Sequence, residues 1–294
     1  MLGRRTLLAA ALLVALTPTA NAKEARLRVD FIDVGQGDAA LITSPGGKTV
    51  LIDGGPHEAG PSLVSFVRQH HKGPLDLILL THRHADHLGG LPAVVEEIGV
   101  RMFMDAPTPH PGKEREHLMD ALERAHVPIR NAEPGRRIDL GSGVILTLLG
   151  PPEPPIVGSR SDVNANSVVA RLDFGATSFL FMGDAETPTE RWLLARHADV
   201  RARVLKVAHH GSRFSSTARF LDAVQPSIAV VSVGARNDYH HPAPGTLRRL
   251  EARGVEVHRT DLEGTVTIES DGRALSTVPA RRRALATTQE LTRP

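Results

Sequence analysis

Thr81-His82-Arg83-His84-Ala85-Asp86-His87 is the stretch that decides the fold of this 294-residue chain. It places three histidines and an aspartate directly after the stretch from Leu75 to Leu80, which is apolar except for Asp76 and is continuously apolar over its last four residues. A short continuous apolar run is typical of a strand that is covered on both faces. Imidazole and carboxylate groups are ligands of zinc, iron and manganese. The stretch therefore indicates a metal-binding loop at the end of a buried strand.

The spacing inside this loop predicts two groups of ligands. Side chains alternate along an extended chain, so His82 and His84 should point to the same side. The following turn can aim Asp86 and His87 at a second point nearby. One short loop can therefore supply ligands to two metal ions.

Two later strand ends carry further candidate ligands. Phe181-Met182-Gly183-Asp184 ends a predicted strand in an aspartate that could bridge two cations. Lys206-Val207-Ala208-His209-His210-Gly211-Ser212 ends another in paired histidines. Each is a weak signal alone, because an aspartate at a strand end is more often a helix cap. Together with the histidine loop they point to a dinuclear centre.

Taken together, these motifs resemble the metallo-β-lactamase fold superfamily, and within it the branch of ComEC-like hydrolase domains from the DNA-uptake channel of competent bacteria. The resemblance covers Leu27 to Glu269. It is carried by the histidine loop and, in chain order, by Phe31–Ala39, Leu51–Gly55, Asn166–Val169, Phe181–Asp184, Lys206–Ser212 and Asn237–Pro242. It implies a four-layer αβ/βα sandwich, with two facing mixed sheets, helices outside, and the metals at one sheet edge.

The resemblance also implies roles for individual residues around two divalent ions, zinc or manganese. The implied metal ligands are His82 and His84 for one ion, Asp86 and His87 for the other, Asp184 as the bridge, and His210 to complete the second site. His209 would contact substrate or orient a ligand, although either of the paired histidines could be the ligand. Asp86 would also position the attacking water, and Asp53 would support the metal-binding loop from behind.

One ligand of the family pattern is missing. The fold usually supplies another histidine to the first ion, some way before the bridging aspartate, but residues 162–167 contain none. Asp162, Asn164 and Asn166 are the oxygen donors available in its place. The first site should then favour manganese or magnesium over zinc, or be only partly occupied.

Asn237-Asp238-Tyr239-His240-His241-Pro242 follows a predicted strand and opens a predicted helix. His241 resembles the last active-site histidine of the family, which implies phosphate binding or protonation of a leaving group. The alternative is that His240 and His241 are two solvated loop histidines.

The remaining sequence indicates one exported α/β domain. Residues 1–22 have the pattern of an export signal: Arg4 and Arg5, an apolar run, and Ala20-Asn21-Ala22 as the cleavage site. We expect the hydrolase domain at 23–279 and a disordered tail at 280–294. The mature chain should contain no membrane span. The segment from Pro151 to Ser161 is predicted to be a linker or an active-site loop.

Short strands should alternate with helices in this domain. The predicted strands are Leu27–Phe31, Thr49–Asp53, Leu75–Leu80, Val144–Leu149, Ser167–Asp173, Ser178–Met182, Val204–Val207, Ile228–Val233, Glu256–Arg259 and Gly264–Glu269. The predicted helices are Leu91–Ile98, Glu114–Ala125, Pro188–His197, Thr217–Val224 and Gly245–Arg253.

Composition narrows the choice of function. The absence of cysteine excludes disulfides and thiolate metal sites, and 3% aromatic content argues against a base-stacking surface. Without Arg4 and Arg5 the basic and acidic residues are equal in number, so overall charge favours no polyanionic partner. The expected function is that of a secreted, periplasmic or extracellular, metal-dependent phosphodiesterase or nuclease that acts on a phosphoester, with DNA as one candidate. The alternatives are hydrolysis of a lactone, thioester or β-lactam, and a non-catalytic binding module related to DNA uptake.

Overall fold

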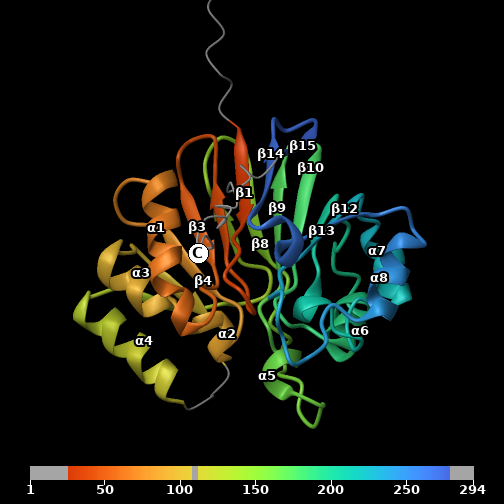
Figure 1. Ribbon diagram of the computed structural model, residues 1–294, viewed down its shortest axis with the longest axis horizontal. Helices are drawn as coiled ribbons and strands as arrows, with labels where there is room; N and C mark the ends of the chain where they lie inside the picture. Colours follow the sequence, from red (N-terminus) through yellow and green to blue (C-terminus); the bar gives the residue numbers. More distant parts are fainter. Residues whose placement is uncertain (1–25, 108–111, 279–294) are drawn as a thin grey trace, which may run out of the picture.

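The computed structural model describes residues 26–107 and 112–278. Two mixed β-sheets face each other, with helices on both outer sides (Figure 1). The predicted αβ/βα sandwich is therefore confirmed. The predicted export signal at 1–22 and the tail at 280–294 lie outside the described residues.

The first sheet has the order β15 (Leu275–Val278), β14 (Val266–Ser270), β1 (Leu27–Phe31), β2 (Ala40–Thr43), β3 (Thr49–Ile52), β4 (Leu77–Leu80), β5 (Phe103–Asp105), β6 (Ile129–Asn131). The second has the order β13 (Glu256–Arg259), β12 (Ile228–Val231), β11 (Val204–Lys206), β10 (Thr177–Phe181), β9 (Ala170–Phe174), β8 (Val144–Leu148), β7 (Arg137–Asp139). The helices are α1 (Gly60–His70), α2 (Ala85–Leu88), α3 (Leu91–Glu97), α4 (Lys113–Arg124), α5 (Asp162–Ala165), α6 (Thr187–Ala195), α7 (Ala218–Val224), α8 (Pro244–Glu251) and α9 (Thr260–Glu263), with 3₁₀ turns η1 (His57–Ala59) and η2 (Ala208–Gly211). Within the described ranges, none of these helices has the length and apolar content needed to cross a membrane.

Strand β4 shows why the central strands are apolar throughout. Leu77 and Leu79 pack in the core between the two sheets. Ile78 and Leu80 point to the other face and pack under α1, α3 and α4. Successive side chains of a strand point to opposite faces, so a strand between two cores needs an apolar residue at every position. The strand preceding the histidine loop is therefore held rigidly from both sides.

The predicted strands and helices are all present, with ends that differ by a few residues. Helix α1 was not predicted, because its start at Gly60-Pro61 has the composition of a turn. Strands β2 and β15 were not predicted either. The same holds for β5, β6 and β7, which have three residues each. Three residues are too few for an alternating pattern to be recognised.

The two sheets approach each other closely where β4 and β10 end. Val168 N donates to Thr81 O at 2.8 Å across this edge. Gly183 follows β10 with φ +51°, and a Cβ there would lie 2.8 Å from Thr81 Cβ. A side chain at position 183 would thus be strained in its backbone and would push the two loops apart. This contact brings Asp184 beside the histidine loop.

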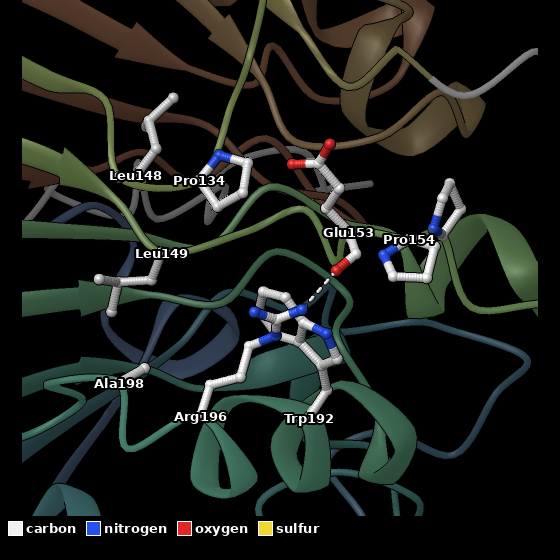
Figure 2. A pocket seen from close by; sticks show the side chains of 10 residues that line it. Pro134, Leu148, Leu149, Glu153, Pro154, Trp192, Arg196 and Ala198 are labelled. Atoms are coloured by element: carbon white, nitrogen blue, oxygen red, sulfur yellow. Dashed lines mark hydrogen bonds between the residues drawn. The ribbon is translucent and has the colours of Figure 1, made fainter.

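Two cavities of similar volume open on the described part of the molecule. One, of about 870 Å³, is lined by the end of β8, the segment after it and helix α6 (Figure 2). There the guanidinium of Arg196 lies 4.8 Å from the Trp192 ring and donates to Glu153 O at 2.7 Å. None of the described residues that line this cavity is a histidine. The other, of about 830 Å³, opens over the loops that follow β4, β10 and β11.

Candidate metal centre

The histidine loop has the conformation that its spacing predicts. His84 is extended, with φ −80° and ψ 151°, and caps the short helix α2. His82 and His84 point together, so that His82 Nε2 lies 3.0 Å from His84 Nδ1. Asp86 and His87 project from the first turn of α2 toward a different point. The change from extended chain to helix at Ala85 therefore separates the side chains of His82 and His84 from those of Asp86 and His87.

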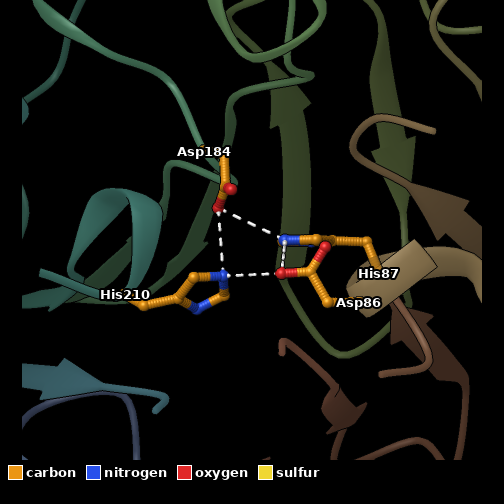
Figure 3. Close-up of side chains that lie close together, drawn as sticks. All are labelled: Asp86, His87, Asp184 and His210. Atoms are coloured by element: carbon orange, nitrogen blue, oxygen red, sulfur yellow. Dashed lines mark hydrogen bonds and ion pairs between the residues drawn. The ribbon is translucent and has the colours of Figure 1, made fainter. Parts of the chain in front are cut away.

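Asp184 lies between these two pairs. Its Oδ1 is 3.3 Å from His87 Nε2 and 3.7 Å from His210 Nε2. Its Oδ2 is 3.7 Å from His82 Nε2. Figure 3 shows Asp184 facing Asp86 and His87, which both come from α2, and His210, which comes from η2. Among the described residues, three groups of potential ligand atoms lie within 4.8 Å of one another. Two of them share Asp184: Asp86, His87, Asp184 and His210, and His82, His84 and Asp184. The third, Asp38, Asp53 and His87, does not include Asp184.

Polar atoms in this cluster are buried without hydrogen-bond partners. They include His87 Nε2 and Asp184 Oδ1. A buried polar group without a partner is costly, and buried charges are normally paired or bound to metals. Nitrogen and carboxylate donors in close groups suit zinc, manganese or iron. The residues present therefore fit two divalent cations.

The electrostatics of the metal-free cluster also indicate that it can hold cations. Burial opposes ionisation of Asp184, but His87 and His210 outweigh it and hold the pKa of Asp184 well below its usual value. Burial would lower the pKa of His210, but Asp184 and Asp38 raise that pKa to about 10. The carboxylates also raise the pKa of His87, against its burial. Without metal, protons on imidazoles balance the carboxylates, and a cation can take their place.

Residues behind the cluster orient the rings. Asp53 accepts from Thr81 N, from Thr81 Oγ1 and from His87 Nδ1, at 2.7, 2.7 and 2.8 Å. Since the Thr81 hydroxyl donates to Asp53, its oxygen accepts from His82 Nδ1 at 3.1 Å. Both histidines therefore present Nε2 to the centre. Carboxylates behind metal-binding histidines commonly set the tautomer in this way.

Asp38 and Lys206 are functional residues that the sequence analysis did not single out. Asp38 Oδ1 lies 3.2 Å from His210 Nδ1, which also donates to Ser232 O at 3.0 Å. Lys206 Nζ lies 2.5 Å from Asp38 Oδ2. Asp38 lies in the Phe31–Ala39 motif and Lys206 begins the Lys206–Ser212 motif, so the family resemblance could have identified both residues.

The oxygen donors expected in place of the missing histidine are mostly engaged elsewhere. Asp162 is exposed and accepts from Gly158 N and Ser159 N. Asn166 exchanges hydrogen bonds with the backbone of Ile156. Asn164 alone of the three lines the cavity, beside His209. Its Oδ1 is buried and without a hydrogen-bond partner.

The cavity over the cluster contains several basic and aromatic side chains. Arg160 and Ser161, from the end of the Pro151–Ser161 segment, line it. The C-terminal end of that segment therefore lies at the cavity over the cluster, whereas Glu153, Pro154 and Pro155 line the other cavity. The guanidinium of Arg160 lies 4.2 Å from the Phe214 ring, and Arg213 lies 4.8 Å from the same ring. Cationic groups at the mouth suit an anionic substrate.

His241 lines this cavity and lies outside the ligand groups. Its ring centroid is 5.5 Å from that of His209 and 5.9 Å from that of Tyr239. Burial, and then the charges of His209 and His210, lower the pKa of His241 to about 4. Its Nδ1 is buried without a hydrogen-bond partner. His241 is therefore neutral at pH 7, and its ring can bind substrate.

Known proteins are similar to this chain in sequence, and others are similar to it in fold. The family model described as the metallo-beta-lactamase superfamily matches residues 32–235, more than half of the chain. ComE operon protein 3 of Bacillus subtilis is 29% identical over 255 residues, 81% of this chain and 32% of that protein. Competence protein ComA of Neisseria gonorrhoeae is 30% identical over 80% of this chain and 31% of that protein. The chain thus spans about a third of the length of these relatives.

Two further comparisons are more distant. Endoribonuclease ysh1 of Schizosaccharomyces pombe is 33% identical over 88 residues, 27% of this chain and 12% of that protein. The crystal structure of the metallo-beta-lactamase fold protein YhfI from Bacillus subtilis superposes with a TM-score of 0.55 at 14% identity, covering 83% of this chain and 100% of that protein. That likeness concerns the fold alone.

Proposed function

The chain belongs to the metallo-beta-lactamase superfamily of metal-dependent hydrolases, and from this premise we propose that it hydrolyses phosphodiesters, with nucleic acid as the candidate substrate. One observation carries the proposal most directly. The cavity that exposes the ligand cluster also presents Arg160, Arg213 and His241. Two cations beside further positive groups would attract a phosphodiester more strongly than a neutral carbonyl compound. The similarity to competence proteins and to an endoribonuclease supports the same choice.

The ligands proposed for the two ions, zinc or manganese, are His82, His84, Asp86, His87, Asp184 and His210. Bound divalent cations supply Lewis acidity: they acidify water and neutralise negative charge that develops on the substrate. The carboxylate of Asp86 is 31% exposed toward the cavity, whereas that of Asp184 is buried. Asp86 can therefore hold a water by accepting a hydrogen bond from it, while Asp184 belongs to both ligand groups.

The neutral His241 is proposed to donate a hydrogen bond to a phosphate oxygen. A donor aimed at developing charge in a cavity of low polarity lowers the barrier to reaction. Arg160 lines the same cavity with about half of its side chain exposed, so its guanidinium can reach a phosphate at the mouth, although Glu186 offsets part of its charge.

The test is hydrolysis of four substrates by the purified protein with added manganese or zinc. These are bis-p-nitrophenyl phosphate, single-stranded DNA, a lactone and nitrocefin. The proposal would be supported by turnover of bis-p-nitrophenyl phosphate and single-stranded DNA. That turnover should be lost in Asp184→Asn and kept in Asp120→Asn. Asp120 is an exposed carboxylate on α4 and serves as the matched control. Turnover of the lactone or nitrocefin alone would assign carbonyl chemistry, and no turnover despite bound metal would indicate a binding module.

We also propose export to the periplasm or the exterior, with cleavage after Ala22, on the pattern of residues 1–22. N-terminal sequencing of protein recovered outside the cytoplasm should begin at Lys23. A sequence that begins at Met1 would contradict cleavage.

A further inference from the structure

The two oxygens of the Asp184 carboxylate have similar surroundings. Oδ1 faces the imidazoles of His87 and His210. Oδ2 faces His82 Nε2 at 3.7 Å and, on its other side, His209 Nε2 at 3.6 Å. Each carboxylate oxygen thus has two imidazole nitrogens beside it. His209 therefore faces Asp184 Oδ2 at 3.6 Å, much as His210 faces Asp184 Oδ1 at 3.7 Å.

Glu186 orients His209 in the manner of a metal ligand. His209 Nδ1 lies 2.9 Å from Glu186 Oε1. Glu186 is buried, and it is held by Arg160 as well. A proton on Nδ1 that is donated to a carboxylate leaves Nε2 as the nitrogen with a lone pair. His82, His87 and His210 likewise have Nδ1 engaged behind the ring, by Thr81, Asp53 and Ser232 respectively.

The backbone explains how neighbouring histidines can reach opposite oxygens. His209 and His210 are both left-handed, with φ 50° and ψ 51°, and φ 50° and ψ 26°. Two successive left-handed residues that are not glycine are strained, and such strain persists where surrounding contacts enforce it. His209 N donates to Gly183 O at 3.0 Å, which ties the turn to the loop carrying Asp184. As a result the two rings lie at 74° to each other, with centroids 6.0 Å apart.

We propose that His209 is a protein ligand of the divalent cation held by His82 and His84, and that Glu186 is its positioning residue. This inference rests on the dinuclear centre proposed above. The imidazole missing from residues 162–167 would then come from the loop after β11. The first site would have three nitrogens and one carboxylate oxygen, a donor set that zinc accepts as readily as manganese. The first site would then have a donor set comparable to that of the second, instead of the weak, oxygen-rich set expected from the sequence.

The rival ligand is Asn164. Its amide nitrogen lies 3.4 Å from His209 Nδ1, and its buried Oδ1 has no partner. An amide oxygen offers one neutral donor and has no carboxylate behind it. His209 has both a nitrogen next to the shared oxygen and an oriented tautomer, so the geometry favours His209.

The experiment measures metal binding rather than turnover. Apo protein is titrated with Mn²⁺ or Zn²⁺ alone by calorimetry, and bound metal is counted by mass spectrometry. His209→Gly removes the imidazole, and glycine adopts the left-handed backbone without strain. His197→Gly is the matched control, because His197 is an exposed histidine with φ 52° outside the cavity. Glu186→Gln and Asn164→Ala complete the set.

We expect two ions per chain in the wild type and in His197→Gly. His209→Gly should keep one ion and lose the other, and Glu186→Gln should weaken that same ion about 10- to 100-fold. Cobalt-substituted His209→Gly should also lose one imidazole by X-ray absorption. Two ions bound with unchanged affinity in both His209→Gly and Glu186→Gln would overturn the inference, as would loss of the first ion in Asn164→Ala but not in His209→Gly. A wild type that binds no metal would instead contradict the proposed function itself.

Discussion

Asp38 and Lys206 form a buried ion pair directly behind His210, with Lys206 Nζ 2.5 Å from Asp38 Oδ2. The exposed fractions of the two side chains are 7% and 4%. Asp38 comes from the loop between β1 and β2, and Lys206 ends β11, so the pair joins the two sheets beneath the ligand cluster. Burial disfavours a charged Asp38, but Lys206 and then His210 outweigh it and lower the pKa of Asp38 to about 2.

Lys206→Met should destabilise the protein by about 3–5 kcal/mol, because it leaves the Asp38 carboxylate buried without its cation. The measurement is chemical denaturation of the metal-free protein. The double variant Asp38→Asn/Lys206→Met should recover part of the loss, since no uncompensated charge remains. A change of less than about 0.5 kcal/mol, as is usual at exposed positions, would show that the pair contributes little.

Asp53→Asn should weaken metal binding by about 10- to 100-fold. Asp53 accepts from Thr81 N at Oδ1 and from Thr81 Oγ1 and His87 Nδ1 at Oδ2, so one position of the amide must place its NH₂ group against a donor. The neutral amide also holds the proton of His87 Nδ1 less strongly, which weakens the contact that directs His87 Nε2 to the centre. Metal affinity is measured by calorimetry, with Asp120→Asn as the carboxylate control. Equal affinities in the two variants would mean that Asp53 only supports the loop.

Asp184→Asn should remove most of the activity and reduce the bound metal, because one substitution affects both ligand groups. The measurements are turnover of bis-p-nitrophenyl phosphate and metal content per chain. If this variant binds two ions as tightly as the wild type, Asp184 is not a bridging carboxylate.

Metal removal by a chelator should abolish activity and lower the melting temperature, and added Mn²⁺ or Zn²⁺ should restore both. A ligand at 100 times its dissociation constant stabilises a folded protein by about 2.7 kcal/mol. Because the pKa values of His87 and His210 are raised in the metal-free protein, binding must release protons, and apparent affinity should rise with pH. Calorimetry in buffers of different ionisation enthalpy counts those protons, and a chelated protein that stays fully active would refute metal dependence.

His241→Gln should lower kcat by about 10²- to 10³-fold without changing metal content, if the ring donates to charge that develops on the substrate. His240→Gln is the control, as the neighbouring histidine is exposed at the same cavity. Similar kcat values for both variants would place His241 among solvated loop residues.

The histidine loop was predictable because everything that shapes it is local. An apolar run ends at Leu80, an extended stretch follows, and α2 begins at Ala85. Alternation along the extended stretch and the turn of a helix are periodic properties of the chain itself. The same reasoning failed at α1, whose Gly60-Pro61 start has turn composition, because burial of Leu63, Val64 and Val67 against the sheet stabilises the helix in spite of it.

The sequence by itself predicted the ligand loop and the candidates at the ends of β10 and β11 from local pattern, and the order of its motifs resembled a family whose fold is the four-layer sandwich. Only the tertiary structure distinguishes the surroundings of His209 from those of His210, which are identical side chains in adjacent positions. Two left-handed residues and the separate partners Glu186 and Asp38 turn their rings toward different oxygens of Asp184. The pairing of Asp38 with Lys206 likewise arises only when the two sheets pack together. Contacts between residues far apart in the chain depend on how the sheets come together, and no local pattern encodes that arrangement.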